Sequence, residues 1–472
     1  MKQTTFHFHR SLVLTIFLGV FFASLVSLMP LGHAAVQVDI FGPGQGRLNL
    51  AIAEPLTAIV DNPVAVGNSA DDASMVSPSA MPKAPVANAL GQKLNALITE
   101  NMSFLPFIRM TDSRTILGGT VLQGYKAPYI DLRRFQIAGS DLVITAGWPD
   151  GDAEKSFVEL RVYEVFSGKL VFGRAYSNVE ESSLVSVADR FSADFMAALT
   201  GRGEFFSSTL AFVKQGSQKT SDVWLVKPTG RKLRKITDMG GQAMSPSWSF
   251  DGRFVVFAHM DDRTHALGVW DRITNRVQRI RFQGNTVIGP CFMPDNKVAV
   301  SLSLNSNPDI YLLNHKFQRE RALEANSSIN VSPSFDAEGK RMAFVSSRLG
   351  GPQIFMKDLT TGEIRRISKI GGYNTEPSIS PDGTLVAFTK LTPQGHRIFV
   401  YDVLTDTERQ VTFGPGRDEQ PAFAPDSYFL AYTSNRSGQS QIYLVTRHGG
   451  DPKRVPTGSG PASTPRWGIF PE

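Results

Sequence analysis

The residue types that bind metals or act as acids and bases are few in this sequence, and they are scattered. Three of the eight histidines fall in the first 34 residues, and there is no His-Glu-x-x-His sequence. The sequence therefore predicts no metal site, and we interpret the remaining histidines as ordinary surface or turn residues. These five are His259, His265, His315, His396 and His448.

Nucleophilic chemistry is not indicated either. The chain has no Gly-x-Ser-x-Gly nucleophile elbow and no glycine-rich phosphate loop ending in Lys-Ser or Lys-Thr. Cys291 is the single cysteine, which excludes an intrachain disulfide, a Cys-x-x-Cys redox pair and a multi-cysteine zinc site. We expect Cys291 to be a small packed side chain, with a reactive thiol as the alternative. No catalytic residue, cofactor or metal is predicted.

Three aspartates, Asp251, Asp382 and Asp426, would look catalytic if they did not recur at one position of an internal repeat. Their recurrence beside Gly or Ser indicates that they build turns. Each repeat carries a marker proline in a Pro-x-aromatic or related sequence, and successive markers are 44, 43, 44, 44 and 44 residues apart. This period is the size of one four-stranded propeller blade. The marker prolines are Pro246, Pro290, Pro333, Pro377, Pro421 and Pro465.

The elements of each repeat follow one order. An Asp-Gly-type turn leads into an alternating apolar stretch, a polar turn follows, and the next strand has an aromatic centre. The first unit lacks a Pro-x-aromatic strand, whereas the last copy, Thr464–Gly468, consists of that strand alone. We therefore predict six blades, with the C-terminus supplying the innermost strand of the first. The aromatic centres are Trp224, Trp270, Tyr311, Phe355, Phe399 and Tyr443.

The fold class is therefore predicted to be mainly β, a six-bladed β-propeller over residues 204–472 preceded by a small α/β domain over 35–203. Residues 35–203 carry 14 basic and 18 acidic side chains, whereas 204–472 carry 33 and 25, which supports a boundary near Gly203. In the N-terminal region the patterns predict strands at Leu48–Ile52 and Asp141–Ala146, a hairpin of Phe157–Phe166 with Lys169–Tyr176, and helices at Ala87–Asn101 and Ser183–Thr200.

Residues 1–34 have the pattern of a cleavable secretory signal. Lys2 and Arg10 precede an uncharged run, Ser11–Leu31, and Gly32-His33-Ala34 places small residues before a cleavage after Ala34. An uncleaved anchor is the alternative, because the run approaches the roughly 20 residues of a spanning helix. We expect a mature chain outside the cytoplasm without stable membrane insertion. The formal net charge of +6 is mild, and we expect no nucleic-acid partner.

This order of segments resembles the TolB family, the periplasmic components of the Tol–Pal system of Gram-negative bacteria. The resemblance covers the whole chain after the signal and is strongest at Ser245–Gly252, Thr375–Gly383 and Pro465–Trp467. Val36–Ile40 is similar to the family's short N-terminal segment. Asp295-Asn296 departs from the usual Asp-Gly. Since prolyl-oligopeptidase-type propellers share the repeat, an exported propeller hydrolase or a glycan-binding propeller is the alternative.

The resemblance implies a non-enzymatic periplasmic adaptor, a monomer before assembly, that supports outer-membrane integrity and invagination during cell division. In this family the propeller binds the lipoprotein Pal and the N-terminal segment engages TolA; other outer-membrane proteins are further expected partners. The TolA-binding candidates are Val36, Gln37, Val38, Asp39 and Ile40.

Candidates for Pal binding come from the loops that lead into the marker prolines, because these loops vary while the framework repeats. We expect the candidates to lie at turn tips, so that charge reversal at Glu376 or a bulky change at Thr286 would weaken binding without lowering stability. They are Gln242, Met244, Thr286, Ile288, Asn330, Asn374, Glu376, Arg417 and Glu419.

Overall fold

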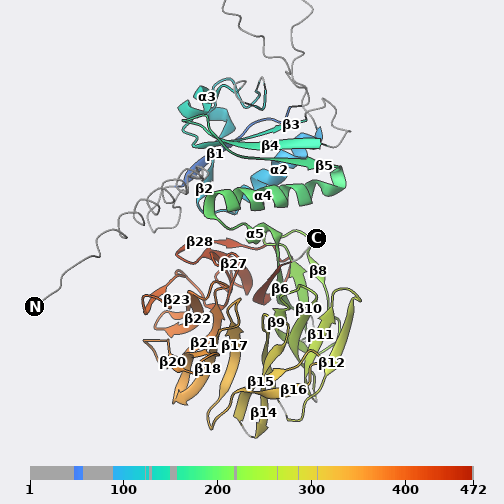
Figure 1. Ribbon diagram of the computed structural model, residues 1–472, viewed down its shortest axis with the longest axis vertical. Coiled ribbons are helices and arrows are strands. Elements are labelled where there is room, and N and C mark those ends of the chain that lie inside the picture. Colours follow the sequence, from blue (N-terminus) through green and yellow to red (C-terminus); the bar gives the residue numbers. More distant parts are fainter. Residues whose placement is uncertain are drawn as a thin grey trace, which may run out of the picture. The chain divides into compact units, whose positions relative to one another are not determined.

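Most strands of this protein belong to antiparallel four-stranded blades that follow one another around a ring (Figure 1). The computed structural model describes residues 47–56, 89–122, 124–126, 130–148, 157–216, 220–262, 264–284, 286–305 and 307–469. Within these residues the chain forms six blades from Ser208 onward, and the first two are joined by a single parallel bridge between Ser221 and Gln242.

The strands of the six blades follow the chain in order, apart from the last one. Blade 1 contains β6 (Ser208–Gln215), β7 (Ser221–Val226), β8 (Arg234–Lys235) and β29 (Ala462–Ile469). Blade 2 contains β9 (Gln242–Trp248), β10 (Phe254–Met260), β11 (His265–Asp271) and β12 (Arg276–Ile280). Blade 3 contains β13 (Val287–Phe292), β14 (Val298–Asn305), β15 (Asn307–Leu313) and β16 (Arg319–Glu324). Blade 4 contains β17 (Asn330–Phe335), β18 (Arg341–Leu349), β19 (Gly351–Asp358) and β20 (Ile364–Arg366). Blade 5 contains β21 (Asn374–Ile379), β22 (Leu385–Thr392), β23 (Gly395–Asp402) and β24 (Thr407–Gln410). Blade 6 contains β25 (Asp418–Phe423), β26 (Phe429–Ser434), β27 (Gln441–Thr446) and β28 (Gly449–Arg454).

The last strand completes the first blade. β29 pairs antiparallel with β6, so that Trp467 lies opposite Leu210 and Ala462 lies opposite Lys214. Because β29 covers the inner edge of β6, that edge does not present unpaired backbone N–H and C=O groups.

Each innermost strand contains a bulge at its marker proline. The residue before each marker has a positive φ, between 49° and 59°, and the pairing register with the neighbouring strand shifts there. Proline suits this position because it has no N–H to leave unpaired where the ladder is interrupted. The repeated proline therefore marks a repeated backbone irregularity. The residues with positive φ are Ser245, Gly289, Ser332, Glu376, Gln420 and Thr464.

The residue after the marker proline joins neighbouring blades. The Ser247 hydroxyl accepts the Phe292 N–H (3.1 Å), and the hydroxyls of Ser334 and Ser378 accept equivalent N–H groups from the next blade (3.0 Å each). Cys291 occupies this position in blade 3, where burial raises the pKa of its thiol. A small packed side chain is therefore the better description of Cys291, because a raised pKa disfavours the nucleophilic thiolate.

The N-terminal region forms a mixed five-stranded sheet in the order β2-β1-β3-β4-β5, with β1 parallel to both β2 and β3. Its strands are β1 (Leu48–Ile52), β2 (Ile108–Met110), β3 (Leu142–Gly147), β4 (Phe157–Glu164) and β5 (Leu170–Ser177). Its helices are α2 (Ala89–Ser103), α3 (Leu132–Ile137), α4 (Leu184–Thr200) and α5 (Glu204–Ser207), with single 3-10 turns at Ser113–Thr115 and Glu181–Ser183.

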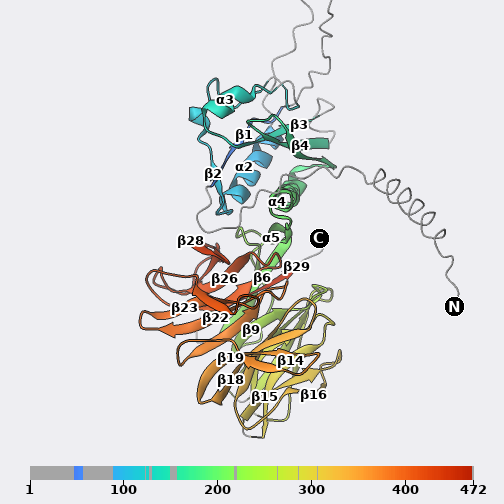
Figure 2. The ribbon, with the colours of Figure 1, turned by 60° about the vertical axis from the view of Figure 1, so that its left-hand side comes forward.

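Helices cover both faces of this sheet (Figure 2). Leu94 of α2 and Phe191 of α4 share a core with Ile144 of β3, whereas Phe135 of α3 packs with Val143 on the other face. The alternation of inward and outward residues along β3 explains why adjacent residues enter different cores. α4 ends at Gly201, whose φ of 78° is a left-handed cap that glycine adopts without a Cβ clash.

The predicted fold class, a mainly β propeller with a small α/β region before it, is confirmed. The predicted N-terminal strands and helices are present with shifts of a few residues at their ends, whereas the short elements α3 and β2 were not predicted. The expected signal in residues 1–34 and the segment Val36–Ile40 lie outside the described residues. The boundary near Gly203 stays a prediction, since the described residues belong to one compact unit. In the part of the chain that the structure describes, no helix has the length and apolarity needed to cross a membrane.

Candidate functional site

The two ends of the propeller differ in what forms them. We call the end where the innermost strands begin the mouth face; it consists of the connections into those strands and the turns between the second and third strands of each blade. Hydrogen bonds join the two sets: the Ser347 N–H donates to the Ile329 carbonyl, and the Leu391 N–H donates to the Tyr373 carbonyl (3.0 Å each). The opposite end, which carries turns 249–253, 293–297, 336–340, 380–384 and 424–428, is called the turn face.

Several sequence-predicted residues lie at the mouth face with part of their surface exposed. Arg417 is exposed, and Gln242, Met244, Thr286, Ile288 and Glu419 are half-buried. Glu419 is hydrogen-bonded through Oε1 to Nδ1 of His396, whose ring stacks on Tyr373 with centroids 6.0 Å apart and an interplanar angle of 9°. The pairing of Glu419 with His396 therefore fixes an aromatic side chain at the rim of blade 5.

Two of the predicted residues do not lie at turn tips. Asn330 and Asn374 are fully buried (0% exposed). The Asn330 amide donates to Asp309 (2.9 Å) and accepts from the Ser346 hydroxyl (2.8 Å), while the Asn374 amide donates to Gln353 (2.8 Å). The expectation that these asparagines lie at turn tips is wrong, because they hold the mouth connections in place from the inside.

Glu376 also differs from its expected position. Its Oε2 accepts the Gln420 N–H (2.9 Å) and the Thr389 hydroxyl (2.8 Å), so it links blade 5 to blade 6. Gln420 repeats the arrangement with Thr433 and Thr464. Desolvation raises the pKa of the Glu376 carboxyl, although both hydrogen bonds act to lower it. Glu376 therefore does not lie at a turn tip, and these contacts predict that charge reversal lowers stability, contrary to the expectation from the sequence.

The mouth face of blades 4 to 6 carries exposed apolar side chains that were not among the nine candidates. Ile370 is 71% exposed and Phe413 is 64% exposed. Among the described residues, blades 1 to 3 expose no large apolar side chain at this end. Exposed apolar side chains gathered at one end of a protein indicate an interaction surface. The six side chains are Ile329, Leu349, Ile370, Tyr373, Leu391 and Phe413, and we call them the apolar rim.

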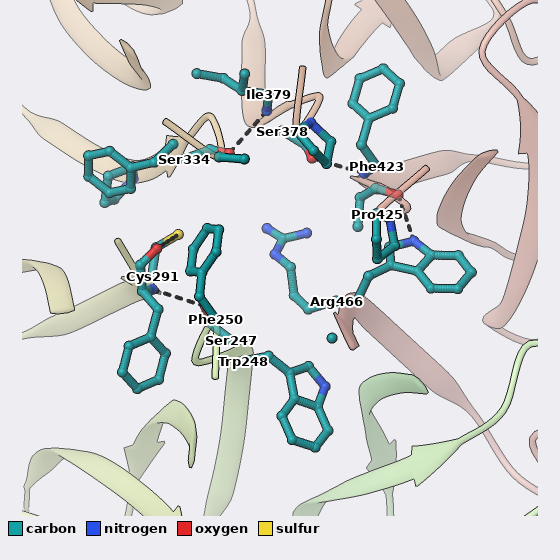
Figure 3. Close-up of a pocket in the computed structure, with 18 of the residues that line it drawn as sticks. Ser247, Trp248, Phe250, Cys291, Ser334, Ser378, Ile379, Phe423, Pro425 and Arg466 are labelled. Carbon is teal, nitrogen blue, oxygen red and sulfur yellow. Dashed lines mark hydrogen bonds between the residues drawn. The ribbon is translucent and has the colours of Figure 1, made fainter. Parts of the chain in front are cut away.

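A channel of about 800 Å³ runs between the innermost strands (Figure 3). Its wall alternates hydroxyl groups, such as Ser334 and Ser378, with aromatic side chains, such as Trp248 and Phe423. Arg466 of β29 extends into the middle of this space. In the residues that the structure describes, no three His, Cys, Asp or Glu side chains come together as a metal site requires.

Asp426, in the turn 424–428 of blade 6, is a buried carboxyl that makes the stability of the propeller depend on pH. It is 2% exposed; its Oδ1 accepts the N–H groups of Tyr428 (2.9 Å) and Phe429 (3.1 Å), and its Oδ2 has no hydrogen-bond partner among the described residues. Burial raises the pKa of Asp426 from 3.8 to about 6; both backbone hydrogen bonds and Arg202 lower it, while Glu204 raises it.

Asp426→Asn is expected to stabilise the protein at neutral pH but not in acid. Because the pKa of Asp426 is raised in the folded protein, folding favours the protonated carboxyl. The stability that this preference contributes is complete below pH 3.8 and is lost as the pH rises through about 6. A difference of about two pKa units corresponds to roughly 3 kcal/mol. Asn keeps the accepting oxygen and cannot ionise, so the gain should reach that size near neutral pH and vanish near pH 4.

Urea unfolding at the two pH values measures this gain. Asp382→Asn is the matched control: it occupies the equivalent turn of blade 5, where hydrogen bonds from Ser380 and Thr384 lower the pKa of the carboxyl, so this variant should lose stability at neutral pH. An equal stability change for Asp426→Asn at both pH values would contradict the assignment.

Comparison with known proteins agrees with this architecture. Residues 196–470 match the family model described as the TolB beta propeller domain. The Tol-Pal system protein TolB of Nitratidesulfovibrio vulgaris is 67% identical over 346 residues, covering 73% of this chain and 72% of the relative. A protein TolB homolog of Chlorobium luteolum is 28% identical over 279 residues, covering 59% and 63%. The crystal structure of TolB from Acinetobacter baumannii shares the fold, with a TM-score of 0.71 at 18% identity over 90% of this chain and 97% of that one. With its propeller matched throughout and two thirds of the aligned residues identical in one relative, the chain belongs to the TolB family.

Proposed function

We propose that this protein is a periplasmic, non-enzymatic adaptor of the Tol–Pal system. Its propeller binds the lipoprotein Pal, and its N-terminal segment Val36–Ile40 binds TolA. The proposal is supported by the 67% identity to a relative named as a Tol-Pal system protein. The structural observation that supports the proposal is the apolar rim, because exposed apolar side chains on the mouth face of blades 4 to 6 are typical of a protein-binding surface.

The apolar rim combines four aliphatic side chains with two aromatic ones, of which Tyr373 is a type enriched at binding hot spots. Fully burying an exposed Ile, Leu or Phe side chain contributes about 1.5–3 kcal/mol. The rim side chains of these types are 44–71% exposed, so each contributes the share that a partner newly covers. Tyr373 is held by its stack on His396, so a partner that covers it loses little side-chain entropy in ordering it. Arg417, exposed four residues after Phe413 in the same connection, provides a charge at the mouth face.

At blade 6 the turn face is less available to a partner, because other parts of this chain contact it there. Phe205 of α5 packs on Phe429 with ring centroids 4.3 Å apart, and Phe107 meets Tyr428 edge-on at 6.2 Å. We therefore assign Pal to the mouth face.

Purified soluble Pal tests this assignment. Tyr373→Ala combined with Phe413→Ala is expected to weaken Pal binding at least about tenfold, which is the loss typical of a truncated hot spot. The melting temperature should change little, because Phe413 is 64% exposed and Tyr373, at 42% exposed, lies at the surface. The matched control is Leu404→Ala, an apolar side chain of blade 5 that is 80% exposed in the turn between β23 and β24, at the other end of the blade. Undiminished affinity in the double variant, with a loss in the control, would reverse the assigned face.

The TolA part of the proposal has its own test. Deleting residues 35–40 should abolish binding of purified TolA while Pal binding and the melting temperature are retained, because a short terminal segment added to a partner's sheet edge acts independently of the propeller. A lowered melting temperature together with lost TolA binding would instead indicate a strand that the fold requires.

A further inference from the structure

The guanidinium of Arg466 is only partly satisfied by the protein around it. Its Nη1 donates both hydrogens, to the carbonyl oxygens of Pro421 (3.1 Å) and Pro465 (3.2 Å). Among the described residues Nε and Nη2 make no hydrogen bond, since both bonds of this guanidinium come from Nη1. These two atoms form one edge of the guanidinium, and in Figure 3 the group projects into the open middle of the channel.

The Arg466 side chain is half-buried in the channel. Enclosure by the blades lowers the pKa of the Arg466 guanidinium, while Cys291 and Glu376 raise it. The Glu376 Oε2 is already occupied by the Gln420 N–H and the Thr389 hydroxyl, so that oxygen serves the link between blades. An enclosed cation with unused donors is stabilised by an anion that accepts from them.

We propose that the channel binds a carboxylate on the Nε–Nη2 edge of Arg466. The two N–H groups on this edge point in parallel and match the two oxygens of a planar carboxylate, which is the bidentate geometry that guanidinium groups favour. A single negative charge also matches a single guanidinium, since Glu376 lines the same cavity and would repel a dianion.

The channel wall indicates what the carboxylate is attached to. Phe250, 47% exposed, extends toward Arg466 in Figure 3, and Trp248 lines the same side of the cavity. These rings offer apolar surface to a short hydrocarbon chain. A free small carboxylate and an acidic side chain of a bound protein share this chemistry, and the inference does not depend on which partner the mouth face binds.

Propionate is the probe, because it combines one carboxylate with a short apolar chain. In the ¹⁵N-labelled full-length protein, the Nε–H resonance of Arg466 is expected to shift saturably with propionate, compared with chloride at equal ionic strength. Arg466→Lys identifies the resonance. By isothermal titration, Arg466→Lys and Arg466→Gln should weaken propionate binding at least about tenfold, because neither retains the bidentate edge. Arg276→Gln, at an exposed position of β12, should bind as the wild type does.

The outcomes are distinguishable. Displacement of propionate by purified Pal would support the site and identify a partner's acidic side chain as a source of the carboxylate; binding undisturbed by Pal would support a free ligand. Saturable propionate binding that survives in Arg466→Gln would overturn the proposal. So would an unshifted Arg466 resonance in the wild type, or sulfate binding more tightly than propionate.

Discussion

A chain that lacks residues 464–472 is expected to melt at least about 10 °C below the full protein and to self-associate. The deletion removes most of β29, including the pairing of Trp467 with Leu210 and of Ile469 with Ser208. It also removes the contact of Trp467 with Phe205, whose rings lie 5.8 Å apart. Losing a large packed aromatic costs about 3–5 kcal/mol before the lost backbone pairing is counted. In a domain of this size each kcal/mol lowers the melting temperature by about 2–4 °C.

Self-association follows from the same deletion, because the inner edge of β6 would present its backbone donors and acceptors to other chains. Calorimetry measures the melting temperature, and size-exclusion chromatography with light scattering measures the mass. Removing only residues 470–472 leaves β29 whole and is the control. A truncated chain that is monomeric and melts with its parent would show that β29 does not close the ring.

Glu376→Lys is expected to lower the free energy of unfolding by at least about 3 kcal/mol. The substitution replaces the acceptor of the Gln420 N–H and the Thr389 hydroxyl with a cation inside the channel. Arg466, whose pKa Glu376 helps to raise, would lose a compensating charge and gain a repelling one. Breaking an enclosed charge arrangement in this way costs about 3–5 kcal/mol.

Two control variants separate charge from hydrogen bonding at Glu376. Glu376→Gln keeps a side-chain acceptor and should cost much less, since the raised pKa shows that the site already disfavours the carboxylate. Arg417→Glu reverses an exposed charge at the same face and should change stability by about 0.5 kcal/mol or less. Urea unfolding near neutral pH measures all three, and a Glu376→Lys protein as stable as Arg417→Glu would refute the blade-linking role.

The architecture was predictable because its signals are local. A marker proline indicates a bulge, and an Asp-Gly-type turn indicates a hairpin. The period at which they recur gives the size of one blade, and the number of copies indicates how many blades to expect. Even the pairing of β29 with β6 follows from comparing which units lack a strand. The short α3 was missed because Leu132–Ile137 is too brief to show a helical period.

The candidate site was predictable only in part, because burial depends on neighbours distant in sequence. Asn330 is buried by Asp309 and Ser346, 21 and 16 residues away, and Glu376 is held by Gln420, 44 residues away. The apolar rim was missed for the converse reason. Ile367 is fully buried and Ile370 is 71% exposed, although the two residues are of one type and three positions apart. Composition does not distinguish them; only the path of the connection between β20 and β21 does.

Hydrogen exchange of the full-length protein with and without purified soluble Pal tests the central claim, that the partner docks on the mouth face of the propeller. The structure predicts slower amide exchange in the connections 326–330, 369–373 and 413–417 and in the turns 347–350 and 391–394, with no change in the turn face at 249–253, 380–384 and 424–428. Protection confined to the turn face, with the mouth connections unchanged, would contradict the assignment.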